Sequence, residues 1–175
     1  MGGAKATALL GGRPLIAWAL DALREAGFDR RAVVAKRDTP LPALDVPLWR
    51  EPDEPRHPLA GVAYALERAA GEDVVTVPVD LPLVAPEVLR ALAETTGCAM
   101  ARGQPLLARF PAGTAIAPRG RATDAVLALR PRVIDAGGLL NVNTPEDLRA
   151  AEEIVTRRAA PGPACSSSPP DRRRR

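Results

Sequence analysis

Aromatic residues make up only 3% of this 175-residue chain, and histidine occurs once. The shortage of aromatic side chains argues against a surface that stacks on single-stranded nucleic acid. With His57 as the only histidine, the chain cannot build a histidine-based metal cluster or a Ser-His-Asp triad. Two cysteines, Cys98 and Cys165, are too few for a disulfide framework, and we expect neither a bridge nor a metal site from them.

Long hydrophobic runs are also missing. No apolar stretch approaches the roughly 20 residues that a membrane-spanning helix needs, and the N-terminal segment, with Lys5 and Arg13, lacks the pattern of a secretory signal peptide. The sequence therefore predicts a cytoplasmic protein with no membrane partner. Its length and its 46% hydrophobic and 26% charged residues are typical of one globular domain with its own core.

The formal net charge of +3 comes from the C-terminal end. Residues 157–175 contain six arginines and one aspartate, which leaves 18 basic and 20 acidic residues in positions 1–156. This slightly acidic body excludes a nucleic-acid-binding surface. We expect a domain over residues 1–158 and a disordered tail over 159–175, where Pro, Ser, Gly and Arg dominate. We interpret the tail as solvated and without a role; the alternative is that its arginines attract an anion or an acidic partner.

Apolar periodicity and Gly or Pro boundaries divide the chain into alternating elements. Helices are predicted over residues 14–27, 59–70, 86–96, 121–129 and 145–157. Strands are predicted over residues 32–35, 48–49, 73–78, 98–101, 106–110 and 132–135. Strands that alternate with helices predict an α/β fold, in which a mostly parallel sheet is covered by helices on both faces.

The segment Val77-Pro78-Val79-Asp80-Leu81-Pro82 is the most informative of the chain. Asp80 directly follows a buried strand and precedes the helix that begins at Pro86. Open α/β sheets bind ligands at the carboxyl ends of their strands, and a carboxylate there is well placed to hold a metal ion against phosphates. We favour this role over the alternative, a carboxylate that caps the next helix.

Two further segments carry polar groups of the same kind. In Met1-Gly2-Gly3-Ala4-Lys5, glycine N–H groups can surround a phosphate and Lys5 can neutralise its charge, although these five residues taken alone favour a frayed N-terminus. In the segment Asn141-Val142-Asn143-Thr144-Pro145-Glu146-Asp147, a capping box accounts for Thr144 to Asp147. It leaves Asn141 and Asn143 unexplained, and their amide groups can coordinate a metal or bind a substrate.

Five segments in this order resemble the molybdenum cofactor guanylyltransferases, the MobA-like nucleotidyltransferases. They are "MGGAKA", "HPLAGVAYAL", "VPVDLPLV", "QPLLARF" and "NVNTPEDL", and the resemblance covers residues 1 to about 155. It implies a Rossmann-like, glycosyltransferase-A-type nucleotidyltransferase fold. The two asparagines of "NVNTPEDL" favour the guanylyl branch over the cytidylyl branch, which tends to carry Asp in their place.

The chain also departs from the pattern of this family. The family's first strand and most of its glycine-rich loop, including an arginine, have no counterpart before Met1, which predicts an N-terminally truncated chain. The family often has Asn near the position of Ala35, and it commonly has Gly where His57 stands. Its aspartate before the second helix is matched by Glu51 or, alternatively, by Asp53.

The resemblance implies transfer of GMP from GTP to the phosphate of molybdopterin with release of pyrophosphate, assisted by Mg²⁺. By this resemblance, Asp80 holds the metal, Lys5 stabilises the developing phosphate charge, and Gly2 and Gly3 also bind the nucleotide. Glu51 or Asp53 contacts the nucleoside. Asn141 and Asn143 line the acceptor side or complete the metal shell. Proteins that mature molybdoenzymes are the implied partners. The alternatives are a cytidylyltransferase or another small nucleotidyltransferase with a different phosphorylated acceptor, and a truncated relative without catalysis.

Overall fold

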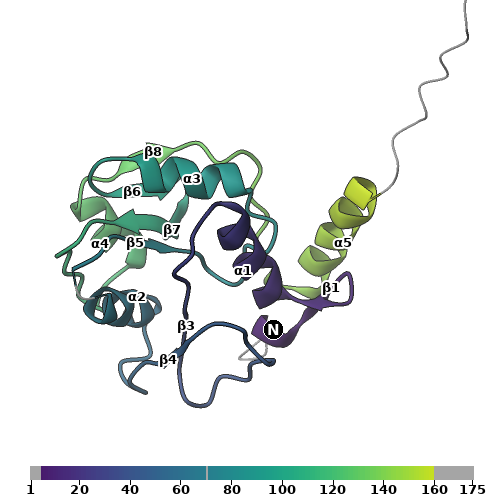
Figure 1. The fold of residues 1–175 in the computed structure, drawn as a ribbon, viewed down its shortest axis with the longest axis horizontal. Coiled ribbons are helices and arrows are strands. Elements are labelled where there is room, and N and C mark those ends of the chain that lie inside the picture. The colour runs from purple at the N-terminus through teal and green to yellow at the C-terminus, as the bar shows by residue number, and fades with distance from the viewer. Residues whose placement is uncertain (1–4, 70, 160–175) are drawn as a thin grey trace, which may run out of the picture.

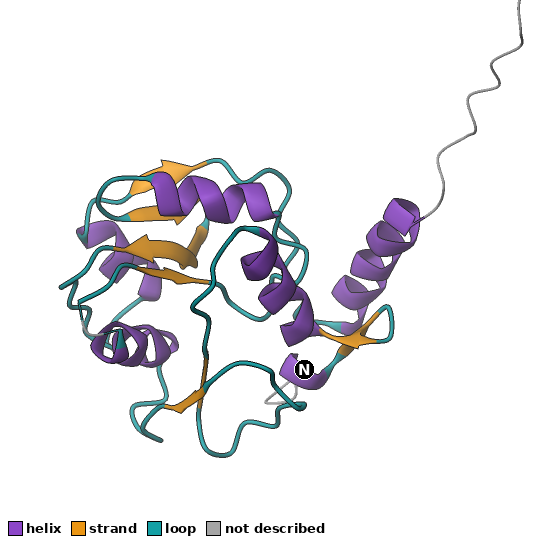
Figure 2. Ribbon diagram, viewed as in Figure 1, coloured by secondary structure: helices purple, strands orange, loops and turns teal. Residues whose placement is uncertain are grey.

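A computed structural model describes residues 5–69 and 71–159 of the chain. Helices and strands alternate along most of it (Figures 1 and 2). The helical elements are η1 (Lys5–Thr7, a 3₁₀ turn), α1 (Leu15–Glu25), α2 (Pro58–Arg68), α3 (Pro86–Glu94), α4 (Ala122–Ala128) and α5 (Pro145–Ala159). The strands are β1 (Leu9–Leu10), β2 (Arg13–Pro14), β3 (Val33–Ala35), β4 (Leu48–Arg50), β5 (Val74–Thr76), β6 (Ala99–Ala101), β7 (Gln104–Phe110) and β8 (Arg132–Ile134).

The strands form three sheets within these residues. The largest has the order β5-β7-β6-β8, β3 pairs in parallel with β4, and β1 pairs antiparallel with β2. The α/β class is confirmed, but the strand directions are more mixed than the mostly parallel sheet that we expected. β7 runs antiparallel to both of its neighbours, and only β6 and β8 are parallel in the largest sheet. The reason is local: only Arg102 and Gly103 connect β6 to β7, and so short a turn joins antiparallel strands.

Helices cover both faces of the largest sheet, as the sequence predicts. On one face, Leu89 and Leu92 of α3 pack with Ala99 and Leu107 from β6 and β7. On the other face, residues of α2 and α4 pack with the next residues along the same strands; this cluster contains Leu59, Val62, Met100, Ala108, Phe110 and Val126. Because successive side chains of a strand point to opposite faces, β6 and β7 contribute to both clusters.

The helix boundaries follow local capping chemistry. His57 caps α2, since its Nδ1 accepts a hydrogen bond of 3.1 Å from the Leu59 N–H, and Pro58 occupies the first turn, where a missing N–H costs nothing. Pro86 likewise begins α3. The predicted helices are all confirmed, with ends shifted by a few residues. The predicted strand over residues 73–78 is shorter, because its pairing with β7 ends at Thr76; the chain turns at Val79 and Asp80.

The β1–β2 hairpin and η1 are not expected from the sequence. Gly11 and Gly12 form the turn of the hairpin with positive φ angles of 56° and 77°, which glycine adopts without strain. The hairpin and α5 lie beside each other at the edge of the molecule (Figure 1), where Val155 approaches Gly11. Within the described part of the chain, no helix is long and apolar enough to cross a membrane.

Candidate active site

Three segments that are distant in sequence meet at Lys5, Asp80 and Asn143. The Lys5 ammonium lies 3.6 Å from Asp80 Oδ2 and donates a hydrogen bond to Asn143 Oδ1. The side chains of Lys5 and Asp80 are 30% and 27% exposed, so the cluster is accessible from solvent. It contains one cation, one carboxylate and one amide, which together can bind a phosphate group and a divalent metal.

The backbone around these three residues is tied together. The Asp80 carbonyl accepts a hydrogen bond of 2.8 Å from the N–H of Val142, whose side chain is fully buried. Ala6 and Val79 pack in one apolar cluster with Ala35 at the end of β3. The neighbours of Lys5, Asp80 and Asn143 are therefore anchored in the core, and the three polar side chains extend from a rigid base.

The capping box predicted at the start of α5 is present and orients Asn143. Asp147 Oδ2 accepts hydrogen bonds from the N–H groups of Asn143 and Thr144, at 2.9 and 2.8 Å, and the Asp147 N–H donates to Thr144 Oγ1 at 3.1 Å. Hydrogen bonds from the backbone N–H groups of Asn143 and Thr144 and from the Thr144 side-chain hydroxyl lower the pKa of the Asp147 carboxyl below its usual 3.8. The cap thus controls the direction of the segment that carries Asn143.

The donor set at this cluster fits Mg²⁺. Asp80 offers a carboxylate and Asn143 an amide oxygen, both hard ligands. No group of three or more His, Cys, Asp or Glu residues elsewhere in the described residues forms a metal cage. Mg²⁺ needs no such cage, because it is commonly bound through one or two carboxylates together with substrate phosphates and water.

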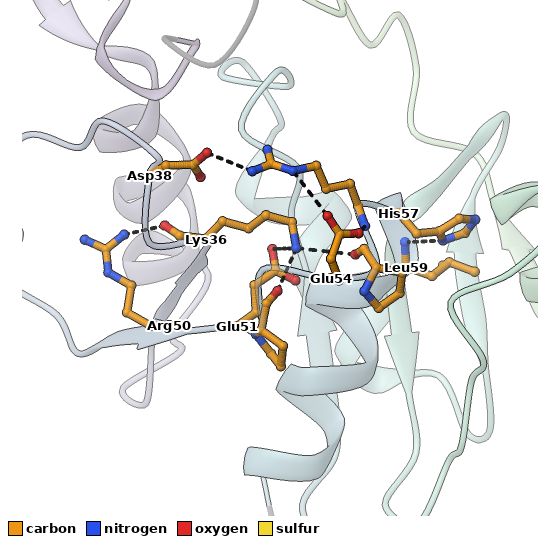
Figure 3. A network of polar contacts seen from close by, with 10 residues as sticks. Lys36, Asp38, Arg50, Glu51, Glu54, His57 and Leu59 are labelled. Atoms are coloured by element: carbon orange, nitrogen blue, oxygen red, sulfur yellow. Dashed lines mark hydrogen bonds and ion pairs between the residues drawn. The ribbon is translucent and has the colours of Figure 1, made fainter.

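A second polar network surrounds Lys36, the residue that follows β3 (Figure 3). Its ammonium donates to the carbonyls of Pro52 and Pro55, at 2.8 and 3.4 Å, and lies 3.7 Å from Glu51 Oε1. The side chains of Lys36 and Glu51 are only 13% and 12% exposed. One carboxylate oxygen, Glu51 Oε2, is buried and has no hydrogen-bond partner within the described structure.

The loop between β4 and α2 is held from both sides. Arg56 pairs with Asp38 at 2.9 Å and with Glu54 at 3.7 Å, and His57 Nε2 lies 2.8 Å from the Gly120 carbonyl oxygen. The hydrogen bond from Arg56 and its charge lower the pKa of the Asp38 carboxyl. These contacts lie at the surface, whereas Glu51 points inward.

The predicted site residues have different places in the structure. Lys5, Asp80 and Asn143 come together, and Glu51 lies in the Lys36 network. Asp53 is exposed in the loop, and Asn141 is half-buried without a side-chain hydrogen bond among the residues described. Gly2 and Gly3 lie outside the described residues. The sequence analysis missed Lys36, although this residue follows a predicted strand as Asp80 does, and the same criterion could have singled it out.

Comparisons with known proteins agree on one family. The sequence profile of the MobA-like NTP transferase domain matches residues 1–135. A "Molybdenum cofactor guanylyltransferase" of Cereibacter sphaeroides is 34% identical over 180 residues, which cover 91% of this chain and 92% of the relative. A protein of the same name from Rhodopseudomonas palustris is 30% identical over 185 residues, which cover 89% and 86%.

Solved structures share the fold. A nucleotidyl transferase from Methanothermobacter thermautotroptrophicus has a TM-score of 0.73 at 22% identity and covers 88% of this chain and 86% of its own. The 2-C-methyl-D-erythritol 4-phosphate cytidylyltransferase from Thermus thermophilus has a TM-score of 0.69 at 19% identity and covers 89% and 95%. At such identities the likeness concerns the fold alone.

Proposed function

The chain belongs to the MobA-like NTP transferase domain family, and from this premise we propose that it transfers GMP from GTP to the phosphate of molybdopterin, with release of pyrophosphate. The observation that carries the proposal is the meeting of Lys5, Asp80 and Asn143. These residues come from three of the segments on which the family resemblance rests. Relatives named molybdenum cofactor guanylyltransferase support the choice of nucleotide and acceptor.

The reaction requires that the two substrates be positioned and that phosphate charge be neutralised, more than it requires proton transfer. An oxygen of the acceptor phosphate forms a bond to the α-phosphorus of GTP, and the bond from that phosphorus to the bridging oxygen of the β-phosphate breaks. The acceptor phosphate is ionised at neutral pH, so no general base is required. In our proposal the Lys5 ammonium stabilises the negative charge that develops on the departing pyrophosphate.

Asp80 and Asn143 are the residues that would hold Mg²⁺. The ion would neutralise phosphate charge and align the triphosphate for in-line attack. Asp80 is well suited because its backbone is tied to Val142 while its carboxylate remains accessible. Asn143 is oriented by the cap of α5. Asn141 and the exposed Asp53 stay proposals for the acceptor and the nucleoside, respectively.

Pyrophosphate release is the direct test of this function. The purified chain would be incubated with Mg²⁺, molybdopterin and GTP, CTP or ATP in turn, and the dinucleotide product would be identified by its mass. We expect release with GTP, dependent on the acceptor. Turnover with CTP instead would move the protein to the cytidylyl branch, and no turnover with any nucleotide would contradict the proposal.

Thermal unfolding supplies an independent test of nucleotide binding. A ligand that binds only the folded state raises the unfolding midpoint according to its affinity. GTP with Mg²⁺ should raise the midpoint more than CTP or ATP does. The cytoplasmic location and the partners in molybdoenzyme maturation, both expected from the sequence, are part of the same proposal.

A further inference from the structure

Lys36 has an environment unlike that of an ordinary surface lysine. Its side chain is 13% exposed, and two of the three N–H donors of its ammonium group are used on the carbonyls of Pro52 and Pro55. Its own carbonyl accepts a hydrogen bond of 2.5 Å from Arg50 of the neighbouring strand. Lys36 thus joins the end of β3 to both ends of the turn that follows β4 (Figure 3).

Glu51 is the carboxylate that this cation faces. The Glu51 N–H donates to the Ala35 carbonyl at 3.1 Å, which continues the β3–β4 pairing by one residue and places Glu51 beside Lys36. The negative charge of the carboxylate is compensated by the Lys36 ammonium, which lies 3.7 Å from Glu51 Oε1. Its Oε2 faces Gly61 of α2, where a Cβ would lie 3.6 Å away, and accepts no hydrogen bond from the described residues.

An ionised carboxylate that is largely removed from water requires donors or a nearby cation. Lys36 supplies the cation. Oε2 is enclosed against Gly61, so a donor from outside the chain would reach the carboxylate at Oε1, which accepts no hydrogen bond from the described residues. A nucleoside carries such donors, as ribose hydroxyls and as base N–H groups.

Ala35, which precedes Lys36, packs in the same apolar cluster as Ala6 and Val79, which adjoin Lys5 and Asp80. The Lys36 network and the cluster of Lys5, Asp80 and Asn143 are therefore anchored on the same apolar cluster.

We propose that Lys36 is a positioning residue that holds the Glu51 carboxylate and the turn at residues 52–55 for recognition of the nucleoside. This inference rests on the proposed function, because a nucleotide must bind for Glu51 to contact it. Lys36 acts through Glu51 and not on the reacting phosphates. Its loss should therefore weaken nucleotide binding and raise KM, while kcat changes little.

The test compares nucleotide affinity across four single variants and the Lys36→Met/Glu51→Gln double variant, with titration calorimetry on the full chain in the presence of Mg²⁺. Lys36→Met removes the charge and keeps the stem, Lys36→Arg keeps the charge, and Glu51→Gln keeps the shape of the carboxylate. Arg30→Met is the matched control, since it removes an exposed cation whose ion pair, with Glu72, lies outside this loop. Thermal unfolding of each variant reports whether the fold is intact.

We expect Lys36→Met and Glu51→Gln each to weaken GTP binding roughly 10- to 100-fold, the range for loss of one hydrogen bond to a charged group. The double variant should be no worse than either single one, because the two residues act as a unit. Lys36→Arg should recover part of the affinity, and Arg30→Met should bind as the unaltered chain does.

Two analogues identify the donor that Glu51 meets. Inosine triphosphate lacks the exocyclic amine of guanine, and 2′-deoxy-GTP lacks one ribose hydroxyl. The analogue without the relevant donor should bind the unaltered chain and Lys36→Met equally, whereas the other should still distinguish them. Unchanged affinity of Glu51→Gln or of a folded Lys36→Met for GTP would overturn the inference and leave the proposed function standing. Failure of the unaltered chain to bind any nucleotide would overturn both.

Discussion

The ammonium of Lys5 and the carboxylate of Asp80 lie 3.6 Å apart, although all the elements from β1 to β5 separate them along the chain. Asn143 joins them from the start of the last helix and accepts a hydrogen bond from the same ammonium. The pair is partly exposed, so it contributes little to stability, in the range of about 0–1 kcal/mol for such ion pairs. The pair matters for the chemistry that its groups can perform together, so substitutions of these residues test the proposed function.

Substitution of Asp80 by alanine should lower the rate of GMP transfer by at least about 100-fold, because the only carboxylate of the cluster would be lost. The unfolding midpoint should change little, since the bond between the Asp80 carbonyl and the Val142 N–H involves the backbone. Pyrophosphate release and thermal unfolding measure the two effects. Asp135→Ala is the matched control, because Asp135 is an exposed carboxylate whose ion pair with Arg102 is long, at 3.9 Å. Near-normal turnover of Asp80→Ala would refute the metal-binding role.

Substitution of Lys5 by methionine should slow turnover roughly 10- to 100-fold and affect folding far less. The stem of the side chain is kept, and only the charge that would face the departing pyrophosphate is removed. Single-turnover kinetics at saturating GTP separate this effect from a change in binding. Unchanged pyrophosphate release would show that Lys5 does no more than neutralise Asp80 in the free protein.

The two asparagines of the segment before α5 should differ in their effect. Asn143 contacts Lys5, while Asn141 makes no side-chain hydrogen bond within the described structure. We therefore expect Asn143→Ala to reduce turnover by about tenfold or more, the scale for loss of one hydrogen bond to a charged group, and Asn141→Ala to act mainly on the KM for molybdopterin. Steady-state kinetics with each substrate varied in turn would measure both. Equal effects of the two variants on kcat would contradict the arrangement.

The cap of α5 predicts a dependence of stability on pH. Hydrogen bonds from Asn143 and Thr144 lower the pKa of Asp147 in the folded state, so its contribution is complete at pH values above its unfolded-state pKa. The contribution is lost as the pH falls through the lower, folded-state pKa. The difference in unfolding free energy between the unaltered chain and Asp147→Asn should therefore be constant near neutral pH and shrink in acid.

Chemical denaturation at pH values from neutral to strongly acidic would measure this difference. Glu152→Gln is a suitable control, because it removes an exposed carboxylate from the same helix away from the cap. A difference that stayed constant into strong acid would mean that Asp147 gains nothing from its ionised form in the fold.

Much of the architecture could be predicted from local signals. A proline in the first turn marks the starts of α2, α3 and α5, and the reciprocal bonds between Thr144 and Asp147 follow from a spacing of three residues. The alternation of predicted strands with predicted helices likewise predicted the layers. Such signals are readable because they depend on residues a few positions apart.

Strand direction was harder to predict. β7 is antiparallel to β6 because the chain turns back within two residues after β6, and it then pairs antiparallel with β5 on its other side; the composition of β7 does not reveal this. The hairpin of β1 and β2 was missed for a related reason, since strands of two residues are too short to show a period.

By itself, the sequence determined the α/β class, the places of the helices, and a short set of polar residues at the ends of predicted strands. The tertiary structure alone decided which of them meet. It joined Lys5 to Asn143 across 138 positions, placed Glu51 rather than Asp53 beside Lys36, and gave the Asn141 side chain no hydrogen bond within the described residues. The physical reason is that contacts over such separations depend on the path of the whole chain and on the packing of its core, and no local pattern contains that information.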